Sequence, residues 1–503
     1  MIENFLAGTA ALFGDPVSIA IFIFGVIGGM LFGAIPGVSM LTLAAILLPF
    51  SAGLEPAQGV MLFAVIYCTG TYGGAITAIL FNIPGAPENA PTAFDGYPMT
   101  KKGLAGKAVG AAVLCSAVGG TASALLMMAA TEQLAHWAIR NIGPPEIFAL
   151  VFFGLAVASS VGGNTIWKGW MSVLLGLMIA TIGQDPVGGI NRYNFGLTDL
   201  AAGIAFVPAI LGFFAVSEIF IQAEKKAFGK YNAPKLSVNF PTFLELWSHK
   251  IAVLRSIIVG FFCGILPGIG ATLAAFMGYG EAVRWSKEKE KFGTGKLEGV
   301  ISSETANNAA TGAAMIPLLA LGLPGGALTA IMVAVFQFHD MEPGPLVFYN
   351  SPELIWVVFA AMFYANVSIL FIGLIETKTI LQLLRIPFTY LAPMILMLAS
   401  IGAYIGRGLV LDVIVMFGAG VLGFLLHRSG YSIAGIVLGI ILGKIGEQNF
   451  AQGMQMVHYD LVTYMSRPIC FILILAGAIT LGAGIYKALS SNRLSQKQVS
   501  EDC

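Results

Sequence analysis

Charged residues are scarce in this chain of 503 residues, because Asp, Glu, Lys and Arg together make up only 10% of it. Soluble domains carry about 25%. Hydrophobic residues make up 57%, and the mean hydropathy is +0.85. A soluble fold could not cover so much apolar surface, so the composition predicts an integral membrane protein. The 26 basic and 26 acidic residues cancel, and no basic tract is present, which excludes the usual nucleic-acid partner.

Cysteine is also sparse, and its five copies (Cys68, Cys115, Cys263, Cys470 and Cys503) stand alone. Without a CxxC motif or a Cys/His spacing, the sequence predicts neither a zinc site nor a disulfide framework. No Ser/His/Asp constellation is visible, which disfavours a membrane enzyme. No basic region precedes the first apolar run, so we expect no cleaved signal peptide.

Apolar runs recur from end to end. They lie at 17–50, 59–83, 105–131, 145–163, 167–184, 199–222, 251–281, 301–338, 353–376, 388–405, 409–427, 432–446 and 468–487. Alternating strand patterns are absent, and a helical crossing needs about 20 residues, so we expect an all-α polytopic membrane protein with about 11–12 spans. A polar linker at 223–250 divides the chain into a first repeat at 1–222, a second repeat at 251–446, and a final span with its tail at 447–503.

The two halves resemble each other around Pro-Gly pairs. Gly29, Gly33, Pro36 and Gly37 match Gly260, Gly264, Pro267 and Gly268 at a shift of 231. Ile83-Pro84-Gly85 matches Leu323-Pro324-Gly325 at a shift of 240. Pro-Gly is common in turns, but two ordered matches at nearly one shift favour a duplication. Each Pro-Gly in 17–50 and 251–281 leaves legs of about 15 residues, or ~22 Å. These legs are shorter than the ~30 Å hydrocarbon core, so we expect re-entrant hairpins.

Basic residues are distributed unevenly. The first 100 residues contain no Lys or Arg, whereas the linker, the loop at 284–298 and the C-terminal tail are rich in them. Because cytoplasmic loops carry an excess of Lys and Arg, we place these segments and the C-terminus inside and the N-terminus outside. Arg407 and Lys444 do not fit this scheme. The order of acidic and basic segments around the second Pro-Gly is reversed between the halves, which indicates inverted-topology repeats.

Inverted repeats with broken helices are typical of secondary transporters. The leg after each break presents free N–H groups to an anion, and the leg before it presents free carbonyls to a cation. We therefore expect 33–39, 82–86, 264–272 and 322–327 to meet at one cavity. The candidate substrate-binding residues are Pro36, Gly37, Ser39, Thr71, Gly73, Gly74, Asn82, Pro84, Gly85, Pro267, Gly268, Gly270, Thr272, Asn307, Asn308, Thr311, Pro324, Gly325 and Gly326.

An alternative role for these polar side chains is to satisfy backbone groups freed by the breaks. We expect no cofactor, and we expect a coupling ion, Na⁺ or H⁺. Sodium would lie near Gly33, Asn82, Gly264 or Gly322. Glu304 opens the segment that holds the two asparagines, and an ionisable residue at membrane depth is a candidate for function. Arg407 and Asp412 are five residues apart and so poorly aligned to pair on one helix face.

Short motifs occur in order along nearly the whole chain. In the first half they are Gly33-Ala34-Ile35-Pro36-Gly37, Gly70-Thr71-Tyr72-Gly73-Gly74, Asn82-Ile83-Pro84-Gly85 and Asp95-Gly96-Tyr97-Pro98-Met99. In the second half they are Gly264-Ile265-Leu266-Pro267-Gly268-Ile269-Gly270, Ala306-Asn307-Asn308-Ala309-Ala310, Gly322-Leu323-Pro324-Gly325 and Pro343-Gly344-Pro345-Leu346. Through this set the chain resembles the large membrane subunit of the bacterial tripartite tricarboxylate transporters.

The resemblance implies a transporter of the bacterial cytoplasmic (inner) membrane that imports a small carboxylate by symport with Na⁺ or H⁺. Citrate or a related tri- or dicarboxylate is the implied solute, with an aromatic or other monocarboxylate as an alternative. The implied partners are a periplasmic solute-binding protein and a small membrane subunit of about four spans. The absence of a phosphate-binding Gly-Lys-Ser/Thr loop agrees with uptake without ATP.

An anion channel stays open as an alternative function, because channels also place half-helices at a pore. Glycine-rich spans such as 418–423 permit a homodimer. Three residues depart from the family's usual pattern and bear on which ligand is bound. Ser39 stands where Gly is common, Gly326 where Ser is common, and Glu88 in a run that is usually small and uncharged. An acid beside an anion site repels the ligand unless it is paired or protonated.

Overall fold

The computed structural model describes residues 1–35, 39–161, 165–185, 188–224, 241–267, 270–383 and 388–501. Within this part of the chain, eight helices are long and apolar enough to cross a membrane. Five shorter apolar helices of 10–17 residues accompany them. The prediction of an all-α polytopic membrane protein is therefore confirmed, while the two inverted repeats stay a prediction.

The first part of the chain is helical from its second residue. It contains α1 (Ile2–Gly14), α2 (Pro16–Ala34), α3 (Met40–Ser51), α4 (Pro56–Phe81), the 3₁₀ turn η1 (Pro87–Asn89), α5 (Ala90–Lys101) and α6 (Ala105–Asn141). Helix α1 precedes the first predicted run. Asp15 caps α2 by accepting hydrogen bonds from the backbone N–H groups of Val17 and Ser18, as expected for an Asp directly before a helix that begins with Pro.

The next part contains the small amount of strand in the described residues. It holds α7 (Pro144–Val161), α8 (Ile166–Ala180), β1 (Gly183–Gln184), β2 (Asn191–Arg192), η2 (Thr198–Leu200), α9 (Phe206–Ile210), the π-helical turn η3 (Leu211–Val216) and α10 (Ser217–Glu224). Strands β1 and β2 form one antiparallel pair. The predicted run at 199–222 is thus three helical pieces in succession, preceded by a 3₁₀ turn.

The second half of the chain also contains both short and long helices. It contains α11 (Phe243–Ser248), α12 (Lys250–Ile265), α13 (Gly270–Trp285), η4 (Lys289–Lys291), α14 (Leu297–Leu321), α15 (Ala327–Phe338), α16 (Val347–Asn350) and α17 (Pro352–Leu383). The last helices are α18 (Phe388–Ile405), α19 (Val410–Arg428), α20 (Ile433–Met456), α21 (Leu461–Ser466) and α22 (Pro468–Glu501). The predicted run at 301–338 is two helices, and α20 continues past the predicted boundary at 446.

Helices α4 and α14 form the centre of the molecule. The whole apolar window of α4 is buried, and α14 is buried from Gly299 to Ala320. Helices α2, α6 and α17 cover α4, while α6, α12 and α13 cover α14, and the two central helices contact each other. The burial of both helices on all sides shows that protein encloses them. The polar side chains of α14 are therefore held away from both lipid and water.

Small residues let the outer helices approach these central ones closely. A Cβ atom added to Gly33 would lie 2.3 Å from the carbonyl oxygen of Gly70, and one added to Gly264 would lie 2.6 Å from that of Ala310. Such contacts leave room only for glycine, as in the small-residue interfaces of membrane helices. Gly33 and Gly264 are matched positions of the two halves. Both matched glycines thus contact a central helix, while the duplication itself stays a prediction.

The two central helices end in the same way. Asn82 ends α4 with φ 59°, and Gly322 ends α14 with φ 75°. Both residues are in the left-handed region, which Gly and Asn adopt most readily. A Pro-Gly pair follows each of them, and α5 and α15 then continue the path of the chain. The second predicted break therefore lies between two helices in both halves.

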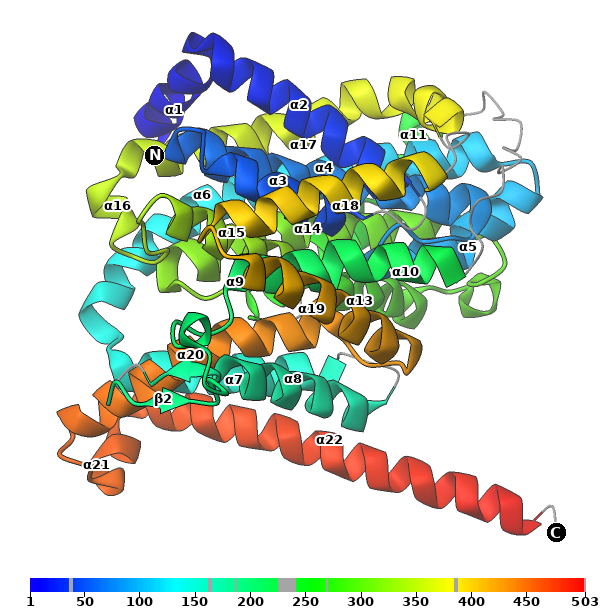
Figure 1. The fold of residues 1–503 in the computed structure, drawn as a ribbon. Coiled ribbons are helices and arrows are strands. Elements are labelled where there is room, and N and C mark those ends of the chain that lie inside the picture. Colours follow the sequence, from blue (N-terminus) through cyan, green and yellow to red (C-terminus); the bar gives the residue numbers. More distant parts are fainter. Residues whose placement is uncertain are drawn as a thin grey trace.

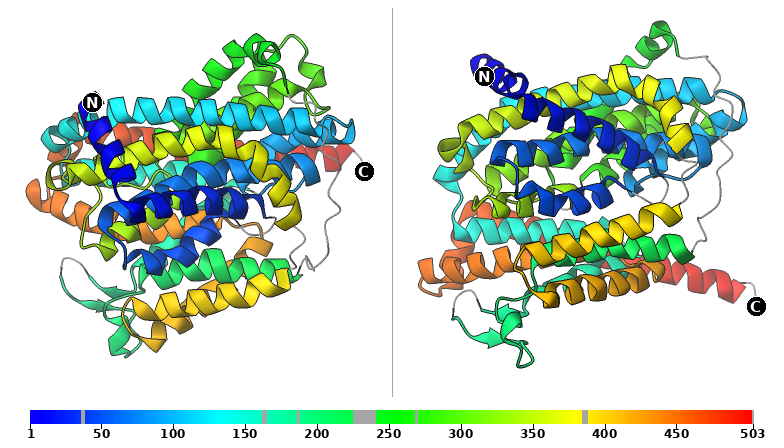
Figure 2. Two further views of the ribbon diagram at one scale, coloured as in Figure 1. Left: turned by 90° about the horizontal axis from the view of Figure 1, so that it is seen from above. Right: turned by 45° about the horizontal axis from the view of Figure 1, so that its top comes forward.

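The termini lie at opposite ends of the long helices (Figures 1 and 2). Helices α5 and α11 lie toward the end that holds the C-terminus (Figure 1). Basic side chains link the segments at this end. Lys107 forms an ion pair with Glu245 at 2.5 Å, and Lys102 Nζ donates to the carbonyl of Thr294 at 2.7 Å. The described end of the linker and the loop at 284–298 thus lie beside Lys102 and Lys107 at one end of the molecule.

Two groups of helices lie beside the centre. Helices α7, α8, α20 and α22 pack on one another, while α18, α19 and the α9–α10 segment form a second group against α3. Arg407 lies between α18 and α19 and pairs with the buried Asp412 through two hydrogen bonds. The expectation of poor alignment was wrong because Arg407 is outside both helices, so the spacing on one helix face does not apply.

Candidate functional site

The two halves of the chain meet where α4 contacts α14. Asn308 Nδ2 donates to the carbonyl oxygen of Cys68 at 3.2 Å. Thr311 Oγ1 donates to the carbonyl of Asn308 at 2.8 Å and lies 3.8 Å from Cys68 Sγ. Both amide atoms of Asn307 are buried and have no hydrogen-bond partner within the described residues. Three predicted site residues are therefore together on one helix, and two of them, Asn307 and Asn308, have amide atoms without a hydrogen-bond partner among the described residues.

The N-terminal ends of α13 and α15 meet beside Tyr67 of α4. A Cβ atom added to Gly270 would lie 3.5 Å from Gly326 Cα and 3.6 Å from the Tyr67 hydroxyl oxygen. One added to Gly326 would lie 3.7 Å from that hydroxyl. Gly270 has φ 51°, a conformation that favours glycine. Both predicted breaks of the second half thus reach one phenol, and the first turns of two helices direct free N–H groups into this region.

The first-half breaks join the same region. A Cβ atom added to Gly85 would lie 2.1 Å from the carbonyl oxygen of Gly33, so the two first-half breaks touch. Glu88, four residues after Pro84, accepts a long hydrogen bond of 3.5 Å from Thr272 Oγ1. The two first-half breaks therefore contact each other, and so do the two second-half breaks. The Glu88–Thr272 hydrogen bond links one pair to the other. Pro36, Gly37 and Gly268 lie outside the described residues.

Some of the remaining predicted residues contact backbone carbonyls, and others contact side chains near the site. Thr71 Oγ1 donates to the carbonyl of Tyr67 within α4, and Gly73 packs against the Met30 carbonyl. Gly74 lies against the Asn89 side chain. Pro267, Pro324 and Gly325 are buried, whereas Pro84 and Ser39 are half-buried and Asn82 is exposed. Ser39 precedes α3 without a side-chain capping bond.

A buried polar network lies next to these residues, and the sequence predicted only one of its members. Glu304 of α14 is fully buried, and its carboxyl is within hydrogen-bond distance of Thr92 on α5 and Ser116 on α6. Ser303 lies 3.0 Å from Thr92. Asn89 Nδ2 donates to the carbonyl of Thr71 at 2.9 Å, and its Oδ1 has no partner in the described chain. Apart from Glu304, these residues look in sequence like ordinary members of helices.

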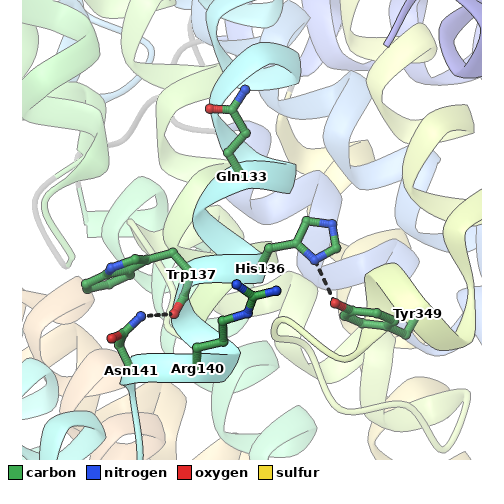
Figure 3. Close-up of a pocket in the computed structure, with 6 residues that line it drawn as sticks. All are labelled: Gln133, His136, Trp137, Arg140, Asn141 and Tyr349. Atoms are coloured by element: carbon green, nitrogen blue, oxygen red, sulfur yellow. Dashed lines mark hydrogen bonds between the residues drawn. The ribbon is translucent and has the colours of Figure 1, made fainter.

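A pocket of about 630 Å³ lies at the end of α6 (Figure 3). It is lined by Gln133, His136, Trp137, Arg140, Asn141 and Tyr349. His136 Nδ1 lies 2.6 Å from the Tyr349 hydroxyl, and Asn141 Nδ2 donates to the Trp137 carbonyl at 2.8 Å. Arg140 is exposed and forms no ion pair with any described residue. None of the predicted site residues lines this pocket, which is at the end of the molecule that holds the N-terminus.

Comparison with known protein families identifies the family of this chain. The model of the tripartite tricarboxylate transporter TctA family matches residues 19–491. The chain belongs to the TctA family. TctA membership confirms the resemblance read from the motifs, and it implies a transporter rather than an enzyme. It also implies a tripartite system with a solute-binding protein and a small membrane subunit.

Two relatives of this TctA chain come from Agrobacterium vitis. An uncharacterized 52.8 kDa protein in the TAR-I ttuC' 3' region is 35% identical over 485 residues, which cover 95% of each chain. An uncharacterized protein in the TAR-II ttuC' 3' region is 33% identical over 234 residues, covering 46% of this chain and 97% of that protein. No solved structure matches the chain significantly.

Proposed function

We propose that this TctA chain imports a small carboxylate, citrate or a related tri- or dicarboxylate, by symport with Na⁺ or H⁺. A periplasmic solute-binding protein delivers the solute, and the chain works in the inner membrane with its N-terminus outside and its C-terminus inside. The gathering of basic segments at the C-terminal end supports this orientation.

Unpartnered buried amides carry the proposal. Asn89 Oδ1, Asn308 Oδ1 and both amide atoms of Asn307 are buried without a partner among the described residues. Most buried polar atoms in proteins have a partner, and leaving one without a partner costs about 1–3 kcal/mol. Amide NH₂ groups donate to carboxylates, and amide oxygens coordinate cations. A bound carboxylate and its coupling ion would satisfy these atoms.

The helix ends at Tyr67 supply positive electrostatic potential without a buried cation. The N-termini of α13 and α15 face each other there, and each helix has at least twelve residues. A helix N-terminus carries roughly half a positive charge and a set of free N–H groups. Two such ends would bind a carboxylate and release it more easily than a buried Arg or Lys. This suits a carrier, which must let its solute go.

The pocket at the outer end of α6 favours the arrival of anions. Arg140 is the exposed cation of its lining, and His136, Gln133 and Asn141 add hydrogen-bonding groups. A positive surface near the entrance raises the local concentration of a carboxylate and the rate at which it is captured. We propose that solute released by the binding protein passes this surface first.

Uptake in proteoliposomes tests the proposal. Vesicles hold this chain with its small subunit, the binding protein is added outside, and radiolabelled citrate is supplied with an inward Na⁺ gradient, an inward H⁺ gradient or neither. Accumulation above the outside concentration that needs both a gradient and the binding protein is the expected result. If citrate only leaks downhill, the chain is an anion channel. Accumulation of another carboxylate in place of citrate would keep the mechanism and change the solute.

A further inference from the structure

A row of hydrogen bonds around Glu304 contains one proton fewer than it needs. The row runs from the carbonyl oxygen of Gly299 to Ser303 Oγ (2.8 Å), on to Thr92 Oγ1 (3.0 Å) and then to Glu304 Oε1. These three contacts need three protons. Ser303 and Thr92 each have one hydroxyl proton. Ser116 Oγ donates separately to Glu304 Oε2 at 2.9 Å and contributes nothing to the row.

A protonated Glu304 completes this row. Its O–H then donates to Thr92, Thr92 donates to Ser303, and the Ser303 hydroxyl donates to the Gly299 carbonyl at 2.8 Å, with the Val300 carbonyl at 3.2 Å as a second acceptor for the same proton. With an ionised Glu304, Thr92 donates to the carboxylate, and Ser303 must leave either Thr92 or Gly299 without a proton. All four side chains are at most 1% exposed, so none of them contacts bulk water. An unmade hydrogen bond at such a depth is costly.

The surroundings of Glu304 offer no compensating cation. Within the described residues it forms no ion pair, and the side chains that interact with it include Asn89 and the second carboxyl Glu88. Asp95 is held elsewhere, by Tyr279 and by the backbone N–H groups of Gly295 and Lys296. The other ionisable side chains that are buried on α4, α6 and α12 are Tyr67, Cys68 and Tyr72 of α4, Cys115 of α6 and Cys263 of α12. A lone buried carboxylate among such groups is strongly disfavoured.

From this geometry we propose that Glu304 is the carrier of the co-transported proton. The inference rests on the proposed function and deepens it by naming the ion and its residue. One proton binds the Glu304 carboxylate when the site is open to the outside, travels with the solute and leaves the carboxyl when the site opens inside. Nothing else is formed or broken.

The position of Glu304 explains how proton and solute are coupled. Glu304 precedes Asn307 by three residues on α14, and residues three and four apart on a helix are neighbours at about 5–6 Å. An anionic solute at the unpartnered Asn307 amide would be repelled by an ionised Glu304 and not by a neutral one. Solute therefore binds better to the protonated form, and by thermodynamic linkage the solute raises the affinity for the proton equally.

Infrared difference spectroscopy of the purified chain tests the protonation without any solute. We expect a protonated-carboxyl band at neutral pH that Glu304→Gln abolishes and that Glu447→Gln, at the Arg192 ion pair, leaves unchanged. Ser303→Ala removes the contact that needs the extra proton, so it should weaken the band at the same pH. A spectrum in which Glu304→Gln changes no carboxyl band would overturn the proposal, whatever the chain transports.

Transport then tests the coupling, with radiolabelled citrate as the probe. Glutamine keeps the hydrogen bonds of the protonated carboxyl, so Glu304→Gln should retain citrate exchange across the vesicle. Accumulation driven by a pH gradient should fall to an inside-to-outside ratio of about 1. Accumulation that persists in this variant, or that follows a Na⁺ gradient at equal pH and is lost with Glu304, would refute a proton at this residue. Failure of the wild type to transport any carboxylate would instead refute the proposed function and leave the infrared result standing.

Discussion

Gly33→Ala tests the close contact that holds α2 against α4. The added methyl group would lie 2.3 Å from the Gly70 carbonyl oxygen and 3.0 Å from Gly70 Cα, so the backbones must separate until the closest contact reaches at least 3.0 Å. Overpacking of this kind costs about 1–3 kcal/mol, and the better helix propensity of Ala returns at most about 1 kcal/mol. We expect a net loss of about 1–2 kcal/mol of stability.

Gly28→Ala is the matched control on the same helix. Its methyl group would lie 3.5 Å from Leu43 Cδ2, an ordinary contact, so propensity alone should act. Thermal unfolding of both variants in detergent, followed by tryptophan fluorescence, gives the comparison. We expect a lower midpoint for Gly33→Ala and an unchanged or higher one for Gly28→Ala. Because Gly33 also touches Gly85, uptake should fall in the first variant only. Equal midpoints in the two variants would refute the reasoning from close approach.

Three further predictions concern the buried amides, the outer pocket and a buried ion pair. Asn307→Ala and Asn308→Ala should each lower citrate uptake by about tenfold or more while leaving the amount of protein in the membrane unchanged, and normal uptake in both would remove them from the site. Arg140→Gln should slow uptake at low salt, and the difference from wild type should vanish as ionic strength rises. Asp412→Asn breaks a pair whose acid is 1% exposed and should cost about 3 kcal/mol, measured as thermal stability. Glu288→Gln, at an exposed pair, should leave the thermal stability nearly unchanged.

The arrangement of unused donors and acceptors was only partly visible in the sequence. Asn307 and Asn308 stood out because amides are unusual in an apolar run. Ser116 and Thr92 did not, since a hydroxyl in a helix usually bonds to its own backbone. Their role depends on α5 and α6 reaching α14 from positions 212 and 188 residues away in the chain. No periodicity within one helix reports such contacts.

The sequence by itself determined the environment and the outline of this protein. Low charge and recurring apolar runs required a membrane, and Pro-Gly pairs marked the breaks in the helices. The positions of the lysines predicted which segments lie on the inner side of the membrane. These properties are local, because each depends on the solvent and on the backbone limits of single residues. The pairing of Arg407 with Asp412, the meeting of Gly270 and Gly326 at Tyr67, and the shortage of a proton beside Glu304 were decided by tertiary structure. Each depends on which distant segments share a buried space, and only packing sets that.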